Sequence, residues 1–136
     1  MTRRAAEREA GHDPKAGLDL KAGAVEAFLP LPVAVFHILV ALADRDRHGY
    51  AVMQDVAART DGKLRLGPGT LYGAIKRMLA AGLIEESNDH DLDRGDERRR
   101  YYRITALGRR VATAEAARLA DLVRQARAMG LVPKRA

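Results

Sequence analysis

Apolar positions in the first half of the chain recur in a pattern that predicts two helices. Residues 33–43 form a nearly continuous apolar run, which is long enough for a buried helix but too short to cross a membrane. A charged turn follows it, and a second helix is expected to begin at residues 48–50 with Val52 and Val56 facing inward. The Asp-Gly pair at residues 61–62 should end this second helix.

A third helix is predicted between Pro68 and Gly82. Pro68 has a fixed φ and no N–H, so it suits the first turn of a helix, and glycine commonly ends one. Apolar residues recur between them at helical spacing, including Leu71, Ile75 and Met78. This spacing is also that of an ordinary amphipathic surface helix. The opposite face should be exposed, and it carries hydrogen-bonding, small and cationic residues: Thr70, Tyr72, Gly73, Lys76 and Arg77.

The residues after Gly82 predict a β-hairpin. Residues 83–87 run from apolar to polar, and residues 100–105 include β-branched and aromatic residues, so each segment suits a short strand. Three helices and a hairpin therefore follow one another in the order of a winged helix-turn-helix. We expect a mainly α fold with a small β-hairpin, and we expect the protein to bind double-stranded DNA.

A long helix is predicted after Thr105, whose hydroxyl can cap it, and Gly130 and Pro133 should end it. About 24 residues at the standard rise extend about 36 Å, which is more than a small winged domain needs for its own core. The surplus apolar stripe predicts an interface with a second copy of the chain. The alternative is docking onto the first helix of the same chain, and both can hold at once. The residues expected in the dimer interface are Leu107, Val111, Leu119, Leu122, Val123 and Ala126.

Several short motifs occur together along this arrangement. They are His48-Gly49-Tyr50, the run 66–72, Lys76-Arg77-Met78-Leu79, Gly82-Leu83-Ile84, and the run 99–105 followed by Gly108. With these motifs, roughly residues 30 to 130 resemble the PadR-type transcriptional regulators. The resemblance implies a winged helix-turn-helix dimer that represses transcription by occupying promoter DNA, with a C-terminal helix joining the subunits. The loop at residues 88–97 departs from the family pattern, because it is longer and more acidic than expected of a wing.

On this interpretation the third helix lies in the major groove, and the two-fold symmetry of the dimer predicts a roughly palindromic operator. The half-sites should lie about one helical turn apart, or a small multiple of it. The resemblance places Tyr50 and Tyr72 near the DNA backbone, although each could instead pack with its hydroxyl at the surface. The competing interpretation is a winged-helix module that binds a protein and no DNA. The expected DNA contacts are Tyr50, Thr70, Tyr72, Gly73, Lys76 and Arg77, then Arg98, Arg99 and Arg100 at the wing base and Arg94 at its tip.

Charge is unevenly divided along the chain. The 136 residues carry a net charge of +6. Residues 1–27 are balanced, residues 28–105 hold 12 Lys or Arg against 11 Asp or Glu, and residues 106–136 hold 7 against 2. We expect these segments to be a flexible N-terminal extension, the winged DNA-binding domain, and the dimerisation helix with its tail. Because the winged segment is nearly neutral, its attraction to DNA must come from cations gathered on one face.

The composition predicts a protein without catalytic or metal chemistry. The chain has no cysteine, which excludes disulfides and thiolate zinc sites, and it contains no phosphate-binding loop. Asp89, Asp91 and Asp93 precede Gly95 as in a calcium loop, but the glycine falls one place late and the twelfth residue is Arg100. We therefore expect no enzymatic activity, no cofactor and no metal. Since no signal peptide or long apolar span is seen, we expect a cytoplasmic protein.

The sequence leaves a small-molecule effector open. A ligand bound between the C-terminal helix and the first helix could change the spacing of the recognition helices, and Phe28 and Phe36 would line such a cavity. However, 4% of the residues are aromatic and none is tryptophan, so a flat aromatic effector would find few stacking partners. The alternative is control by the amount of the protein alone.

Overall fold

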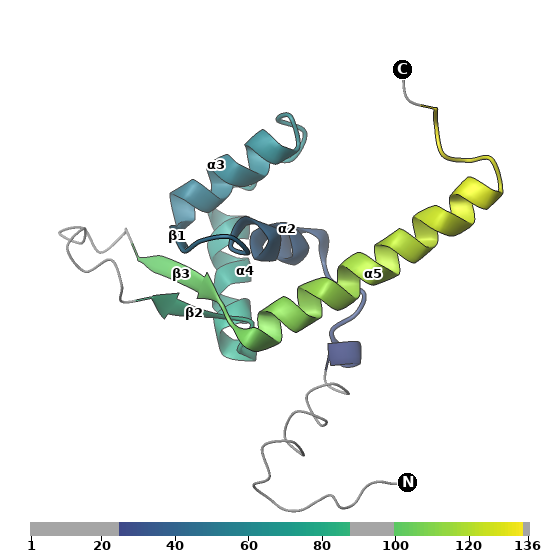
Figure 1. Ribbon diagram of the computed structural model, residues 1–136. Coiled ribbons are helices and arrows are strands. Elements are labelled where there is room, and N and C mark those ends of the chain that lie inside the picture. The colour runs from purple at the N-terminus through teal and green to yellow at the C-terminus, as the bar shows by residue number, and fades with distance from the viewer. Residues whose placement is uncertain (1–24, 88–99, 135–136) are drawn as a thin grey trace, which may run out of the picture.

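The computed structural model describes residues 25–87 and 100–134, in which a helical body carries one small sheet at its edge (Figure 1). The helices are α2 (Val33–Ala41), α3 (Gly49–Arg59), α4 (Pro68–Ala81) and α5 (Ala106–Ala128), and the strands are β1 (Arg47–His48), β2 (Ile84–Ser87) and β3 (Tyr101–Ile104). This order is that of a winged helix-turn-helix, so the predicted fold class is confirmed. None of the helices in the described ranges is both long and apolar enough to span a membrane.

The core lies where α2 packs against the two helices that follow it. Helix α2 is almost entirely apolar, and its Ile38 and Leu39 are fully buried. Helix α3 contributes Val52 and Val56 to the same cluster, and α4 contributes Leu71. Burying a large aliphatic side chain contributes about 1.5–3 kcal/mol, so this cluster is a main source of the stability of the fold.

Helix α4 begins and ends at residues whose backbone chemistry favours those positions. Pro68 stands directly after the N-cap Gly67, where a missing N–H costs no helical hydrogen bond. Gly82 follows the helix with a φ of 80°, in the left-handed region that favours glycine. The helix predicted between Pro68 and Gly82 is therefore confirmed, with its apolar side buried.

The sheet has three strands, whereas the sequence predicted a hairpin of two. Strands β2 and β3 pair antiparallel with Ile84 opposite Ile104, and β1 pairs with the other edge of β3. The prediction missed β1 because two residues cannot show an alternating pattern, and Arg47 was assigned to the charged turn and His48 to the start of the second helix. The Arg47 side chain holds this segment in place, since its Nε donates a hydrogen bond of 2.7 Å to the carbonyl oxygen of Ala41.

Strand β3 leads directly into α5 through Thr105. The Thr105 hydroxyl accepts a hydrogen bond of 3.0 Å from the Gly108 N–H, so it is the predicted cap, and it donates one of 2.6 Å to the Gly82 carbonyl oxygen. Gly108 also lies so close to Leu83 that a Cβ at Gly108 would overlap the Leu83 carbonyl oxygen. The end of α4 and the start of α5 are therefore held against each other.

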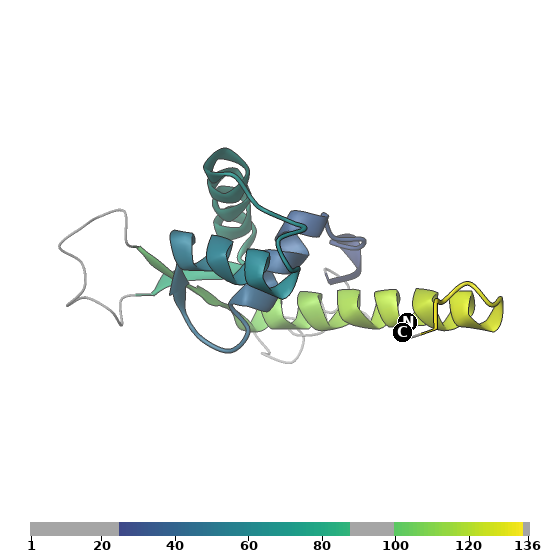
Figure 2. The same cartoon turned by 90° about the horizontal axis from the view of Figure 1, so that it is seen from above.

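Helix α5 packs on the winged body with its first half, and its second half projects away from it (Figures 1 and 2). The buried residues of α5 are Gly108, Val111 and Glu115, whereas residues 116–128 are exposed or half-exposed. Val111 is fully enclosed by its own chain, so we correct its assignment and place it in the core of the monomer. Leu107 is half-buried and packs against the same core.

Candidate nucleic-acid interface

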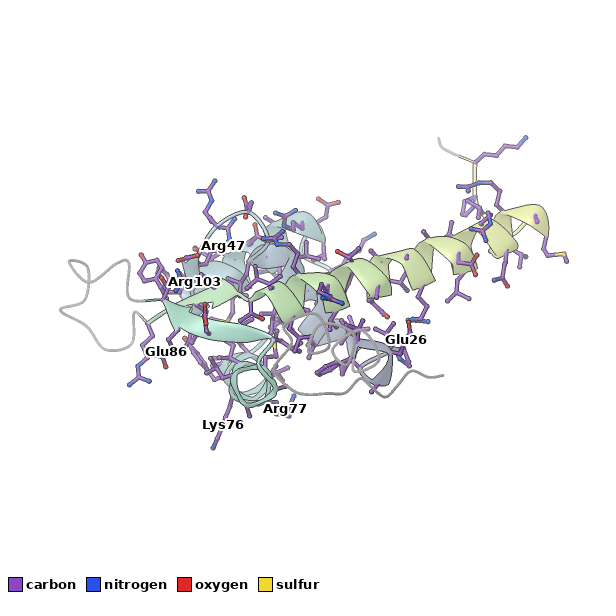
Figure 3. All side chains as sticks on the ribbon, turned by 60° about the horizontal axis from the view of Figure 1, so that its bottom comes forward. Glu26, Arg47, Lys76, Arg77, Glu86 and Arg103 are labelled. Atoms are coloured by element: carbon purple, nitrogen blue, oxygen red, sulfur yellow. The ribbon has the colours of Figure 1, made fainter. Side chains whose placement is uncertain are left out.

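The outer face of α4 carries the residues that were predicted to be exposed there. Thr70, Lys76 and Arg77 are exposed, and Figure 3 shows Lys76 and Arg77 on the side of α4 that faces away from α5. Gly73 is half-exposed, and Arg77 Nη1 lies 3.6 Å from the position that a Cβ of Gly73 would occupy. The helix contains two cations and no acidic residue, so its outer face is locally positive although the winged segment is nearly neutral.

The first turn of α4 is open to a ligand. Residues 67–70 are exposed, and the N-cap Gly67 makes no side-chain hydrogen bond to the amides of the first turn. A Cβ added at Gly67 or Gly69 would meet no atom within 4 Å. Backbone N–H groups at the start of a helix bind phosphate oxygens well, because the positive end of the helix dipole lies there.

Two tyrosines gather at the start of α3, beside α4. The Tyr72 ring lies over Gly49, so closely that a Cβ at Gly49 would be 2.7 Å from Tyr72 Cζ. Tyr50 follows Gly49 in the sequence and is 60% exposed, whereas Tyr72 is 41% exposed. Tyr72 thus packs with one side of its ring and keeps part of its side chain at the surface.

Residues of β1 and β3 support this corner of the molecule. His48 is the N-cap of α3, and its Nδ1 accepts a hydrogen bond of 3.2 Å from the Ala51 N–H. The His48 ring packs edge-on against Tyr101, with the ring centroids 5.3 Å apart. Tyr102 is buried, and this burial raises the pKa of its hydroxyl. The strands therefore fix the first turn of α3 relative to the sheet.

The described arginines at the base of the wing have acidic partners. Arg103 of β3 pairs with Glu85 of β2 at 3.0 Å, and Arg100, which directly precedes β3, pairs with Glu86 of β2 at 3.3 Å. Such exposed pairs contribute about 0–1 kcal/mol, so the Arg100–Glu86 pair adds little to the stability of the fold. The predicted contacts Arg94, Arg98 and Arg99, and the acidic segment with calcium-like spacing, lie outside the described residues.

An ion-pair network between β1 and α3 was missed by the sequence analysis. Asp55 pairs with Arg47 at 3.5 Å and with Arg59 at 2.6 Å, and Arg47 also lies 3.4 Å from Asp44. The spacing of Asp55 and Arg59 is that of neighbours on one helix face and could have been noticed. The pairing with Arg47 depends on β1, which local patterns did not reveal. The network ties the strand to the helix.

The projecting half of α5 exposes apolar side chains at helical spacing. Leu119, Leu122 and Val123 are 36%, 48% and 46% exposed, and Ala126 lies one turn further along the helix. Four of the six residues predicted for a dimer interface are therefore available to a second chain.

Glu115 is a buried acid of α5 that the sequence analysis also missed. Its carboxylate is 3% exposed and accepts two hydrogen bonds of 2.8 Å from Arg118, which hold its pKa below the usual range. A signal was present, because Glu115 follows Gly108 and Val111 at intervals of seven and four residues on the buried side of the helix.

Two open grooves run beside α5, with volumes of about 580 and 540 Å³. Ala114 and Ala117 line both. Phe28 and Phe36 pack against the core and line neither groove, so the effector cavity expected beside them stays a prediction. Within residues 25–87 and 100–134, no three His, Asp or Glu side chains gather in a way that could hold a metal ion.

Comparison with known proteins identifies relatives of this chain. A curated, uncharacterised protein of Lysinibacillus sphaericus is 35% identical over 72 residues, which are 53% of this chain and 64% of that protein. A transcriptional regulator of Mycobacterium tuberculosis is 35% identical over 89 residues, which are 65% of this chain and 78% of that protein. A solved PadR family transcription regulator from Clostridium difficile matches with a TM-score of 0.61 and 22% identity, covering 72% of this chain and 98% of that one.

This chain spans less than two thirds of the length of two of the curated relatives that it matches. The family model for the PadR-like transcriptional regulators matches residues 38–114, from within α2 into α5. That match covers more than half of the chain and includes the whole winged helix-turn-helix after the start of α2. The chain therefore belongs to the PadR-like family of transcriptional regulators.

Proposed function

We propose that this protein is a transcriptional repressor that binds double-stranded DNA as a homodimer, with α4 in the major groove. The outer face of α4 is the observation that carries the proposal, because it combines an open first turn with Lys76 and Arg77 and lacks acidic residues. An α-helix fits the major groove of B-DNA, and a phosphate can bind the amides of the first turn. Membership of a family of transcriptional regulators supports the same function.

The exposed residues of this surface can be given separate roles. Thr70 and Lys76 would reach base edges, while the exposed tyrosines and Arg77 would contact the DNA backbone. Gly73 adds no side chain, so the backbone of α4 can approach the DNA closely there. Arg100 would bind a phosphate beside the groove, together with Arg98 and Arg99, and Arg94 would lie at the tip of the wing. Residues 28–105 would thus contact the DNA, and residues 106–136 would join the subunits.

The exposed apolar residues of α5 support the homodimer. Leu119, Leu122, Val123 and Ala126 follow the spacing of one helix face, and a second copy of α5 would remove them from water. A two-fold axis between the helices presents two copies of α4 to the DNA. We therefore expect a roughly palindromic operator with half-sites about one helical turn, or a small multiple of it, apart.

A gel-shift titration against DNA from upstream of the protein's own gene tests the proposal. We expect binding that resists unrelated competitor DNA and weakens with salt, with a slope of about −0.9 in the logarithmic plot for each phosphate contact. The double variant Lys76→Ala with Arg77→Ala should lose this binding. Equal competition by unrelated DNA, or binding that the double variant leaves unchanged, would contradict the proposal.

A winged-helix module that binds a protein is the second candidate. The pairing of Arg100 with Glu86 and of Arg103 with Glu85 favours it, because these pairs neutralise the base of the wing. In that case the chain would show no binding to DNA of any sequence at low salt, where electrostatic attraction is strongest.

A further inference from the structure

Glu115 occupies the point at which α5 leaves the winged body. Three residues near the start of α5 contact the body. Thr105 donates a hydrogen bond to the Gly82 carbonyl oxygen, Arg109 donates one of 2.9 Å to the Ala43 carbonyl oxygen, and Val111 is buried in the core. Glu115 is the last buried residue of α5. Beyond it, as Figure 2 shows, the helix continues without the body beside it.

The Glu115 carboxylate connects α5 to the segment that leads into α2. The backbone N–H of Leu31, which is itself buried, donates a hydrogen bond to it. On its other side, Arg118 Nε donates a hydrogen bond of 2.8 Å to Oε1, and Arg118 Nη2 donates one of 2.8 Å to Oε2. The carboxylate is therefore held from two directions, by the body and by its own helix.

Stability alone is a weak reason for a buried acid at this position. Replacing a buried ion pair with apolar residues of similar size is often neutral or stabilising. An apolar side chain would hold α5 through contact area, which has no preferred direction, whereas hydrogen bonds require defined angles. The Glu115 contacts therefore restrict the tilt of the helix more than an apolar contact would.

A small tilt at Glu115 becomes a large displacement at the far end of α5. The helix continues from Ala116 to Ala128, and these 13 residues extend about 20 Å at the standard rise. A tilt of about 10° would move the far end by about 3.5 Å, which is about the rise of one base pair. In a dimer joined through this half of α5, the same tilt changes the distance between the two copies of α4.

We propose that Glu115 is a positioning residue that sets the direction of the projecting half of α5, and with it the half-site spacing that the dimer accepts. This inference rests on the proposed function, because it needs a dimer that binds two half-sites. Arg118 acts through Glu115 by holding the carboxylate toward Leu31.

The test measures the affinity of the full chain for a series of operators whose half-sites are separated by zero to four added base pairs. The wild-type dimer should favour one spacing, and Glu115→Gln should lower that preference at least threefold, which corresponds to about 0.7 kcal/mol. The matched control is Asp121→Asn, which removes the acid of the Asp121–Arg124 pair. That pair has the same i,i+3 spacing on the same helix but is exposed, so the control should keep the wild-type profile.

The readout separates positioning from stability. Circular dichroism and sedimentation would establish that each variant is folded and dimeric. A Glu115→Gln dimer that melts earlier but keeps the wild-type spacing profile would overturn the inference. If Glu115→Gln does not fold, Arg118→Gln is measured instead, because this change keeps the hydrogen bond between Leu31 and Glu115. Arg118→Gln should also lower the preference for one half-site spacing. A wild-type chain that binds no operator of the series would instead overturn the proposed function, whatever the variants do.

Discussion

The hydroxyl end of the Tyr72 side chain lies where a Cβ of Gly49 would be, and this contact joins the first turn of α3 to the proposed recognition helix. A side chain at position 49 would occupy the space of the ring. Helices α3 and α4 therefore pack closely at this point because Gly49 has no Cβ.

Replacing Gly49 with Ala should displace Tyr72 and destabilise the protein by about 1–3 kcal/mol, the usual cost of overpacking. The variant Tyr72→Ala removes the obstacle, so the double variant should be less destabilised than the sum of the two single changes. Urea unfolding of all four proteins provides the free energies of unfolding. Strictly additive free energies would show that the two residues do not touch in solution.

Gly108→Ala should destabilise the protein more severely than Gly49→Ala, by more than about 3 kcal/mol. The new Cβ would meet the carbonyl oxygen of Leu83, which is backbone and cannot rotate away as a ring can. Gly69→Ala is the matched control in a helix, because a Cβ there meets no atom within 4 Å. Thermal unfolding of both variants tests this contrast, and similar melting temperatures would argue against the close contact of α5 with Leu83.

Lys76→Ala and Arg100→Ala should affect DNA binding in different ways. If Lys76 reaches a base edge, its loss should cost about 1–3 kcal/mol at one operator position and change the preferred base there. Loss of Arg100 should weaken binding to all sequences alike and lower the salt slope by about 0.9. Binding to a randomised operator library, repeated at several salt concentrations, separates these effects. A salt slope that Arg100→Ala leaves unchanged would show that Arg100 contacts no phosphate.

The double variant Leu119→Glu with Leu122→Glu should give a folded monomer with little operator affinity. Both side chains lie on the projecting half of α5 and contribute little to the core of their own chain, so the winged body should survive. Burying each carboxylate in an apolar interface costs roughly 2 kcal/mol or more. This cost is enough to separate a dimer of moderate affinity. Sedimentation measures the assembly and circular dichroism the fold. A double variant that is still dimeric would place the interface elsewhere.

The contribution of Glu115 to stability should disappear in acid. Hydrogen bonds from Arg118, together with the N–H of Leu31, hold the pKa of Glu115 below its ordinary value of 4.5. The folded protein therefore binds this proton less readily than the unfolded chain. The stabilisation is present above pH 4.5 and is lost as the pH falls through the lowered pKa of the folded state.

The measurement compares urea unfolding of the wild type and Glu115→Gln at neutral pH and below about pH 4, where carboxylates take up protons. The difference in free energy of unfolding between the two proteins should shrink in acid. Asp121→Asn should show a small difference at both pH values, since its ion pair is exposed. A difference of equal size at both pH values would mean that the charge of Glu115 is not involved.

Features that depend on nearby residues could be predicted from the sequence. The ends of α4 follow from Pro68 and Gly82, which act on their own backbone within one turn. The outer face of α4 follows from helical periodicity, and the cap of α5 follows from Thr105. These predictions needed no knowledge of how distant segments meet.

Features that depend on distant contacts could not be predicted in the same way. Strand β1 has two residues, and its existence depends on pairing with β3 far along the chain. The pairing of Arg100 with Glu86 depends on how β2 and β3 align. Val111 and Leu119 belong to one apolar pattern, yet one is in the monomer core and the other is exposed. The sequence does not show where α5 leaves the body, because that point depends on the size of the body.

The Thr105 contact also bears on how this protein could diverge in evolution. Its hydroxyl bonds to Gly82 and accepts from Gly108, so the chain between residues 82 and 105 is closed at its base by residues on both sides of the wing. An insertion or deletion between β2 and β3 would leave the contact between the end of α4 and the start of α5 intact. Relatives could therefore differ in the length and charge of this segment without changes to the scaffold that carries it.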